Sequence, residues 1–342
     1  MPTRSLTLLI LPLLLLWGAL GAAASPSLRL AADVWPPFTD VEDKPHEAID
    51  LVKVALQRGG VESTVAILLW SDLIKQLEQG KLDGAPAVWR TPEREKFLLF
   101  SKPYLENRLV LVARKGDNVS FPSIGQLAGK RLALVKDYGY GDAVKKAPSV
   151  TIVYRDNEAE CLRAVLSKQA DYLLLDELMV RHLFEFYASK AKELIAAGTI
   201  PIVRYPLHFA LRKDYPGARQ ILDNFDRNIT RMMSDGTYNV LLHVPWIRTD
   251  VNGDGVPEFV ASTKQQMNTP QGGGDPSKTQ GGYPVFYDTG PAPIVGRTPP
   301  SYIIDGKTYN TWGDAATNVE RAGPTKPQGL YKYSTGVVLF DF

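Results

Sequence analysis

The chain has 342 residues, which is enough for two domains of ordinary size. Its composition, 44% hydrophobic and 22% charged, is typical of a globular protein. The formal net charge of +2, with no block of Lys and Arg, argues against nucleic acid as a partner, because nucleic-acid binding needs a concentrated basic surface.

The N-terminal segment has the pattern of a secretory signal peptide. Arg4 gives a positive start, residues 6–20 form an apolar run, and three alanines at 22–24 precede Ser25. The apolar run also approaches the length of a membrane anchor, but the Ala-x-Ala end favours cleavage. We therefore expect a signal peptide over residues 1–24 and a soluble mature chain, periplasmic or otherwise secreted, that begins near Ser25.

Strand-like and helix-like segments alternate from about residue 27 to residue 246. Short apolar runs bounded by polar or Gly residues predict buried strands at 27–33, 63–70, 84–89, 108–114, 131–137, 149–156 and 171–177. Periodic segments predict helices over 48–60, which ends in two glycines, and over 71–80, with Ser71 as its N-cap. This alternation is typical of α/β layers around a largely parallel sheet.

The second half of this region contains a helix start, an interrupted strand and a helix pair. Residues 157–160 resemble a capping box that opens a helix. The apolar stretch 200–214 is interrupted by Pro206, which a central strand tolerates poorly. A crossover between two domains explains that proline. Residues 216–243 predict two helices separated by Asp235-Gly236.

The composition changes after Trp246. Residues 264–300 are rich in Gly, Pro, Gln, Ser and Thr, and they predict a flexible linker. Aromatic residues return over 301–342 with strand-like character. A segment this short holds little core alone, so we expect a small β-like module there, docked on the main body or separate from it.

A charged segment, AVWRTPERE over residues 87–95, has the features of an anion site. Thr91 is placed to cap a helix that begins at Pro92, where a proline is best tolerated. Arg94 then falls beside the free N–H groups of the first turn, where a carboxylate would meet a bidentate guanidinium and helix-end donors. The alternative is that Arg94 pairs with a neighbouring glutamate at the surface.

Several motifs follow in an order that resembles a known family. They are ADVWPPF, EAIDLVKVAL, LDGAPAVWRTPEREKFLLFSKPY, GKRLALVKDYGYGDA, NEAECLRAVLSKQADYLLLDE and SDGTYNVLL. Over about residues 27–247 the chain resembles the extracytoplasmic solute-binding proteins of family 3, the amino-acid-binding receptors of ABC importers. The resemblance implies the two-lobed periplasmic binding protein fold of type II, with two crossing strands and ligand in the cleft. Lobe 1 would take 25–104 and 208–247, and lobe 2 would take 107–204.

The resemblance also implies roles for four residues. Arg94 matches the arginine that grips the ligand α-carboxylate, and Asp176 matches the aspartate that accepts the α-amino group. Such a pair, one on each lobe, would be bridged by a zwitterion that draws the cleft shut. Trp35 and Trp70, the second at the end of a predicted strand, match rings that line the ligand pocket. The alternatives are an N-cap for Asp176 and core positions for both tryptophans.

The chain departs from the family at two points. Trp89 stands where the family usually has Ser or Thr, and residues 137–140, Asp-Tyr-Gly-Tyr, replace a loop of small hydroxyl residues. Bulky rings, Trp89 and Tyr138, therefore replace small polar groups on both walls. The ligand is expected to be an amino acid, with a flatter or aromatic solute, or another amine or carboxylate, as the alternative.

A second motif, DVNGDGVPEFV from Asp250, resembles calcium loops of the EF-hand or dockerin type and, more closely, of FG-GAP repeats. The expected ligands of this loop, which lies within residues 250–261, are Asp250, Asn252, Asp254, the carbonyl of Val256, and Glu258. Ala261 replaces the bidentate glutamate of an EF-hand. We expect a structural Ca²⁺, and an Asx/Gly-rich turn is the alternative.

The leading hypothesis is a non-enzymatic, monomeric receptor that needs no cofactor for its function and serves the membrane permease of an ABC importer. One alternative is an enzyme on the same scaffold, similar to cyclohexadienyl dehydratase, with Asp137 or Glu47 as the acid or base. Another is a ligand-sensing subunit. Cys161, the single cysteine, is expected to be a small buried hydrophobe.

Overall fold

A computed structural model describes residues 27–44, 46–186, 188–264, 275–277, 283–285 and 301–320. The predicted signal peptide lies outside these residues, as do most of the predicted linker and residues 321–342. Within the described ranges, none of the helices combines the length and the apolar character needed to cross a membrane.

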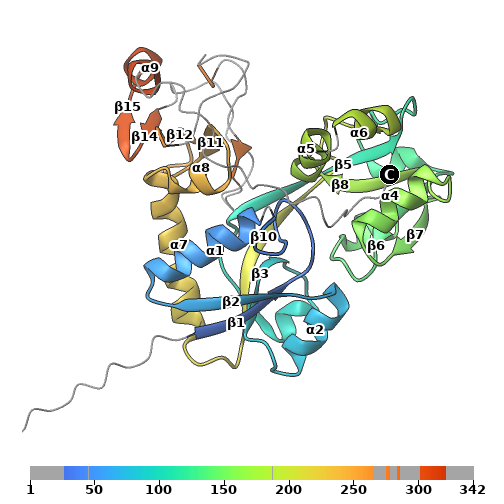
Figure 1. Cartoon of the computed structure of the whole chain (residues 1–342), viewed down its shortest axis with the longest axis horizontal. Helices are drawn as coiled ribbons and strands as arrows, with labels where there is room; N and C mark the ends of the chain where they lie inside the picture. The colour runs from blue at the N-terminus through green and yellow to red at the C-terminus, as the bar shows by residue number, and fades with distance from the viewer. Residues whose placement is uncertain are drawn as a thin grey trace, which may run out of the picture.

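The described chain forms two α/β lobes and a smaller C-terminal module (Figure 1). A mixed sheet of ten strands continues through both lobes in the order β2-β1-β3-β10-β5-β8-β6-β7, with β4 beside β10 and β9 beside β5. The strands of lobe 1 are β1 (Ser27–Ala32), β2 (Glu62–Ile67), β3 (Gly84–Trp89) and β4 (Leu98–Phe100). Those of lobe 2 are β6 (Arg131–Val135), β7 (Thr151–Arg155), β8 (Tyr172–Asp176) and β9 (Ile195–Ala197).

Helices cover the sheet in each lobe. Lobe 1 carries α1 (Glu47–Arg58), α2 (Trp70–Glu78), α7 (Ala218–Ser234), α8 (Thr237–Leu241) and the 3₁₀ turn η1 (Arg94–Lys96). Lobe 2 carries η2 (Ile124–Leu127), α3 (Gly141–Lys145), α4 (Glu158–Leu166), α5 (Glu177–Phe186) and α6 (Ala188–Leu194). Asp235 and Gly236 separate α7 from α8, as predicted.

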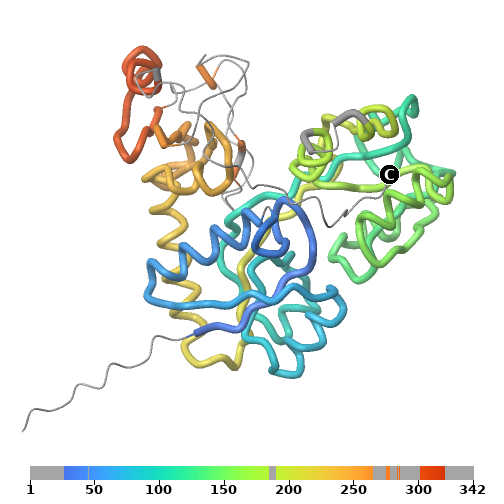
Figure 2. Tube along the Cα trace, viewed as in Figure 1, coloured from blue at the N-terminus to red at the C-terminus, as the bar shows by residue number. Residues whose placement is uncertain are grey.

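Two long strands join the lobes. The chain leaves lobe 1 in β5 (Leu105–Arg114) and returns in β10 (Val203–Arg212), so lobe 1 contains both early and late segments of the chain (Figure 2). The first half of β10 pairs with β5 and the second half with β3. Pro206 lies in the first half, opposite Glu106. The two-lobed fold predicted from the sequence is confirmed.

Two predicted helix starts have different outcomes. Asn157 caps α4 as expected: its side chain accepts from the Glu160 amide at 2.9 Å, and the Glu160 carboxylate accepts from the Asp156 amide at 3.3 Å. Ser71 is not a cap. Strand β2 ends early, the extended backbone of Leu69 turns the chain, and α2 begins at Trp70. Trp70 therefore opens a helix instead of ending a strand.

The C-terminal module contains a second sheet, in the order β13-β11-β12-β14-β15, and one helix (Figure 1). Its elements are β11 (Trp246–Thr249), β12 (Glu258–Ala261), β13 (Tyr283–Pro284), β14 (Tyr302–Ile304), β15 (Lys307–Tyr309) and α9 (Trp312–Glu320). The predicted β-like segment contains the strands β14 and β15 and, in addition, the helix α9, which Thr311 caps: its hydroxyl oxygen accepts from the Asp314 amide at 3.2 Å. Ile247 and Val260 of this sheet belong to the main hydrophobic core.

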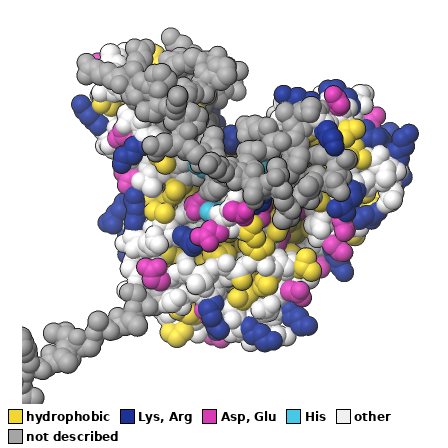
Figure 3. Space-filling view, viewed as in Figure 1, with side chains coloured by type: hydrophobic (Ala, Val, Ile, Leu, Met, Phe, Trp, Pro, Cys, Tyr) yellow, Lys and Arg dark blue, Asp and Glu magenta, His cyan; other side chains and the backbone are white. Residues whose placement is uncertain are grey.

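Charge is distributed over the surface. On the face shown in Figure 3, Lys and Arg side chains lie on both lobes, with Asp and Glu among them. Cys161 is buried in α4, as expected for a small hydrophobic side chain.

Candidate functional site

Arg94 is buried between the lobes, with 7% of its surface exposed. Strand β3 brings the chain to Trp89, and β4 begins at Leu98, so the helix predicted from Pro92 has room for only a short turn. The segment forms the 3₁₀ turn η1 instead, in which the Thr91 hydroxyl oxygen accepts from the Arg94 amide at 3.3 Å. An anion at this point would therefore meet the guanidinium of Arg94 and not the end of an α-helix.

The Arg94 guanidinium is fixed by contacts from both lobes. It donates to the Trp89 carbonyl at 2.7 Å and to the Asp137 carbonyl at 3.3 Å, and it stands 4.6 Å from the centre of the Trp70 ring. Burial lowers the pKa of Arg94 to about 10, so the side chain stays charged at neutral pH. These two hydrogen bonds use two of its five N–H donors. By contrast, the neighbouring Arg90 is exposed and pairs with Glu95.

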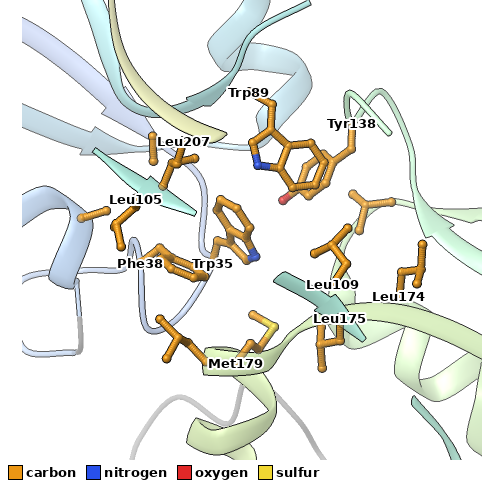
Figure 4. Close-up of a cluster of buried hydrophobic side chains, with 14 of the residues drawn as sticks. Trp35, Phe38, Trp89, Leu105, Leu109, Tyr138, Leu174, Leu175, Met179 and Leu207 are labelled. Carbon is orange, nitrogen blue, oxygen red and sulfur yellow. The ribbon is translucent and has the colours of Figure 1, made fainter. Parts of the chain in front are cut away.

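Aromatic rings surround this guanidinium. The Tyr138 ring centre is 5.6–6.2 Å from those of Trp35, Trp70 and Trp89, and each pair meets edge to face. The Trp35 and Trp89 ring centres are 5.8 Å apart. In Figure 4 the rings of Trp89 and Tyr138 lie together near Trp35, and Met179 of lobe 2 lies on the other side of Trp35. Edge-to-face pairs of this kind each add about 0.5–1.5 kcal/mol beyond burial.

Two acidic side chains in this region were not predicted from the sequence. Asp33 of lobe 1 accepts a hydrogen bond of 2.6 Å from the Tyr138 hydroxyl of lobe 2, and burial raises its pKa. Glu158 is buried in the first turn of α4, where burial and the charge of Asp33 raise its pKa to about 8. A signal for Asp33 was present, since it precedes Trp35 in the ADVWPPF motif. Glu158 looked like an ordinary first-turn residue.

Asp176 lies at the end of β8 and caps α5. Its carboxylate accepts from the amides of Leu178 and Arg108, both at 2.8 Å, and from the Asn107 side chain at 3.2 Å. Asn107 in turn accepts from the Trp89 indole at 2.6 Å. Burial raises the pKa of Asp176 to about 7. The N-cap alternative therefore describes the observed contacts, and a contact with a ligand amine stays a prediction.

A small pocket remains between the lobes. It is lined by Asp33, Trp35, Trp70, Ala87, Trp89, Arg94, Tyr138 and Gly139. The structure therefore brings all the predicted ligand residues together except Asp176. Of the two residues considered as acid or base, Glu47 opens α1 away from this lining, and Asp137 contributes its backbone carbonyl to the contacts above.

The predicted calcium loop gathers its acidic side chains. One carboxylate oxygen from each of Asp250, Asp254 and Glu258 lies within 4.8 Å of the others. The Asn252 side chain donates to Asp254 and Glu258. Asp250 accepts from two amides of the loop. The loop thus holds its oxygens in a compact group without any helix on either side.

Comparison with known proteins gives a family match. The model of the bacterial extracellular solute-binding proteins, family 3, matches residues 28–247. This range covers both lobes and ends inside β11, so most of the C-terminal module lies beyond it.

Three relatives show what the matched region is similar to. The virulence sensor protein BvgS of Bordetella pertussis is 28% identical over 185 residues, which cover 52% of this chain and 15% of BvgS. The ABC transporter glutamine-binding protein GlnH of Bacillus subtilis is 27% identical, over 52% of this chain and 62% of GlnH. The chain thus spans less than two thirds of either relative. The ABC transporter arginine-binding protein 1 of Escherichia coli is 24% identical, over 67% of this chain and 95% of that protein.

Two solved structures are similar in fold. An ancestral arginine-binding protein bound to arginine has a TM-score of 0.55 and 25% identity, and the match covers 64% of this chain and 97% of that one. The ancestral amino-acid-binding protein AncCDT-1, a precursor of cyclohexadienyl dehydratase, has a TM-score of 0.52 and 25% identity, over 63% of this chain and 93% of that one.

Proposed function

Because the chain belongs to the bacterial extracellular solute-binding proteins, family 3, we propose that it is a receptor that captures an amino acid, or a similar small amine or carboxylate, between its lobes. It delivers this solute to the membrane permease of an ABC importer. The observation that carries the proposal is the buried guanidinium of Arg94 in an aromatic pocket that also contains the carboxylate of Asp33.

The two charged groups fit the two ends of a zwitterion. Arg94 has N–H donors for a carboxylate, and planar bidentate pairing suits that ligand. Asp33 is the carboxylate in the pocket lining, so it is placed to meet an amine in addition to, or instead of, Asp176. The rings of Trp35, Trp70 and Trp89 would cover the solute side chain. Capture needs hinge motion and no covalent chemistry.

The test is a panel of amino acids, amines and aromatic acids measured by calorimetry and thermal shift. A saturable stabilisation that Arg94→Ala abolishes supports the receptor. Arg90→Ala is the matched control, because Arg90 lies in the same segment but is exposed and paired with Glu95. Binding that does not depend on Arg94 contradicts the proposed site.

An enzyme on the same scaffold is the second candidate, and the similarity to AncCDT-1, a precursor of cyclohexadienyl dehydratase, supports it together with the buried Glu158. A buried carboxyl group with a pKa of about 8 is suited to act as a general acid near neutral pH. A cyclohexadienyl acid incubated with the protein would then be consumed. Turnover that disappears in Glu158→Gln would replace the receptor proposal.

A ligand-sensing role is the third candidate, and the similarity to BvgS supports it. In that case the bound solute would change contacts with a membrane partner and would not be released for import. Solute uptake by cells that lack the protein separates the two roles: unchanged uptake favours sensing.

We also propose that Asp250, Asn252, Asp254, Val256 and Glu258 hold a structural Ca²⁺. Oxygens bound to one Ca²⁺ at about 2.4 Å lie no more than about 4.8 Å apart, and the acidic oxygens of the loop meet this limit. Calcium should raise the melting temperature and a chelator should lower it, and Asp254→Asn should weaken this response. Stability that is unchanged by chelator contradicts the calcium site.

The proposed location is outside the cytoplasm, with the signal peptide removed before Ser25. The family membership supports this location. Mass spectrometry of the exported protein measures the new N-terminus. Retention of residues 1–24 in the exported chain would indicate an anchor instead.

We also propose that the protein is a monomer, and sedimentation tests this state.

A further inference from the structure

One loop of lobe 2 bonds directly to the ligand-pocket residues of lobe 1. The Asp137 carbonyl accepts from the Trp70 indole at 3.2 Å and from the Arg94 guanidinium at 3.3 Å. Asp137 holds the left-handed backbone conformation, with φ of 61°, which is uncommon for a residue other than Gly. The backbone of this loop thus takes hydrogen bonds from the two side chains that were expected to contact a solute.

The next residue fills the space between the lobes. Tyr138 is 7% exposed, its hydroxyl donates to Asp33 at 2.6 Å, and its ring meets those of Trp35, Trp70 and Trp89. The cavity beside it is about 20 Å³. A cavity of that size holds about one water molecule, so an amino acid does not fit while Tyr138 is in place.

Gly139 allows this close approach. A Cβ atom at Gly139 would lie 2.8 Å from Cγ2 of Thr91 and 3.5 Å from Nη1 of Arg94, both in lobe 1. Contacts under 3.0 Å require one group to shift. Glycine at this position is therefore explained by direct contact between the lobes.

We propose that Tyr138 occupies the ligand pocket from within the protein. Its side chain holds the two lobes closed, and a solute must displace it in order to bind. Its phenol stands against Asp33 where a ligand amine would stand, and its ring takes the place of a ligand side chain among the tryptophans. Tyr138 is then the residue that limits both the size and the affinity of the solute.

The proposal predicts how affinity changes. If the pocket is open only a fraction of the time, the apparent Kd is the intrinsic Kd divided by that fraction. Removing Tyr138 removes this competition. We expect Tyr138→Ala to bind its solute at least tenfold more tightly than the natural chain, and Tyr138→Phe, which keeps the ring but loses the bond to Asp33, to show a smaller gain.

Self-closure can be measured without any solute by small-angle X-ray scattering. The natural chain should match the closed structure, and Tyr138→Ala should show a larger radius of gyration. Gly139→Ala should open the lobes in the same direction without removing a side chain. The matched control is Gly125→Ala in the same lobe. The nearest atom to a Cβ added there is the Ser123 hydroxyl oxygen, at 4.0 Å. Far-UV circular dichroism verifies that each variant is folded.

The affinity measurement rests on the proposed function, whereas the scattering measurement does not. Arginine and glutamine serve as probes in calorimetry on the natural chain and on Tyr138→Ala. A natural chain that scatters like the open variants overturns the proposal, whatever binds to it. Equal affinities in the two chains also overturn it. If scattering shows self-closure but neither chain binds a solute of the panel, the occupation of the pocket by Tyr138 stands and the receptor function fails.

Discussion

Glu158 shows how a single buried side chain makes stability depend on pH. It faces Asp33 of lobe 1 across the lobe contact, Tyr138 of its own lobe, and Cys161 within its own helix. Burial and the charge of Asp33 raise its pKa from 4.5 to about 8. The folded chain therefore holds this proton between about pH 4.5 and 8, a range in which the unfolded chain has released it.

This pKa gives a pH dependence with a defined sign. The stability contributed by Glu158 is complete below the unfolded pKa and is lost as pH rises through the folded pKa, by at most about 1.4 kcal/mol per pH unit. The melting temperature should therefore fall more steeply from pH 6 to 8 in the natural chain than in Glu158→Gln. The comparison with this variant is needed because Asp176, whose pKa is raised to about 7, acts in the same direction. Parallel curves for the two chains would show that Glu158 does not titrate in this way.

Asp176 gives a second test at the residue scale, because its observed role differs from its predicted one. Asp176→Ala would leave the buried amide of Leu178 and the partly buried amide of Arg108 without this acceptor. Each lost acceptor of this kind costs about 1–3 kcal/mol. Urea unfolding should show this loss in Asp176→Ala and a smaller one in Asp176→Asn, which keeps an acceptor oxygen. If Asp176→Asn stays stable but loses solute binding, the predicted contact with an amine is supported as well.

At the scale of elements, α4 depends on its cap. The Asn157 side chain satisfies the Glu160 amide, and the first turn that it fixes also positions Glu158. Replacing an asparagine cap by alanine costs about 0.5–2 kcal/mol. Asn157→Ala should lower the free energy of unfolding, measured by urea denaturation, by this amount, and Asn157→Ser should restore most of it. Equal stability of the alanine and serine variants would mean that the cap contributes little.

Local patterns predicted the elements better than the contacts between them. The Asn157 cap, the helix pair around Gly236 and the crossover at Pro206 could be predicted because each depends on residues close in sequence or on one backbone constraint. The helix predicted from Pro92 is only a 3₁₀ turn over Arg94–Lys96, because β4 follows too soon for a longer helix, and only the pairing of β4 with β10 reveals this. The bond between Tyr138 and Asp33 joins residues 105 positions apart. A contact between residues so far apart leaves no local pattern in the sequence. The bulky rings could therefore be predicted to line the pocket, but not to fill it.

At the scale of the whole molecule, the C-terminal module is joined to the two lobes. The Tyr283 hydroxyl donates to the carbonyl of Glu106, at the start of the hinge strand β5, at 2.9 Å. The Asn239 side chain of α8 donates to the Val260 carbonyl of β12 at 2.8 Å. Ile247 and Val260 are fully buried in the core that also contains α7 and α8. The module therefore contacts both the hinge and lobe 1.

These contacts predict that the family-matched region is less stable alone than in the full chain. A chain that ends at residue 247 loses the aliphatic packing of Val260, worth about 1.5–3 kcal/mol. It also loses the shorter of the two hydrogen bonds that the Asn239 side-chain amide donates and keeps only the one to the Pro245 carbonyl at 3.4 Å, at a further cost of about 0.5–1.5 kcal/mol. The truncated chain should therefore unfold at a clearly lower urea concentration than the full chain. Val260→Ala in the full chain is the graded comparison, because it removes packing but keeps the carbonyl, and it should lose only part of this stability. Coincident unfolding curves for the truncated and full chains would mean that the two lobes fold independently of the module.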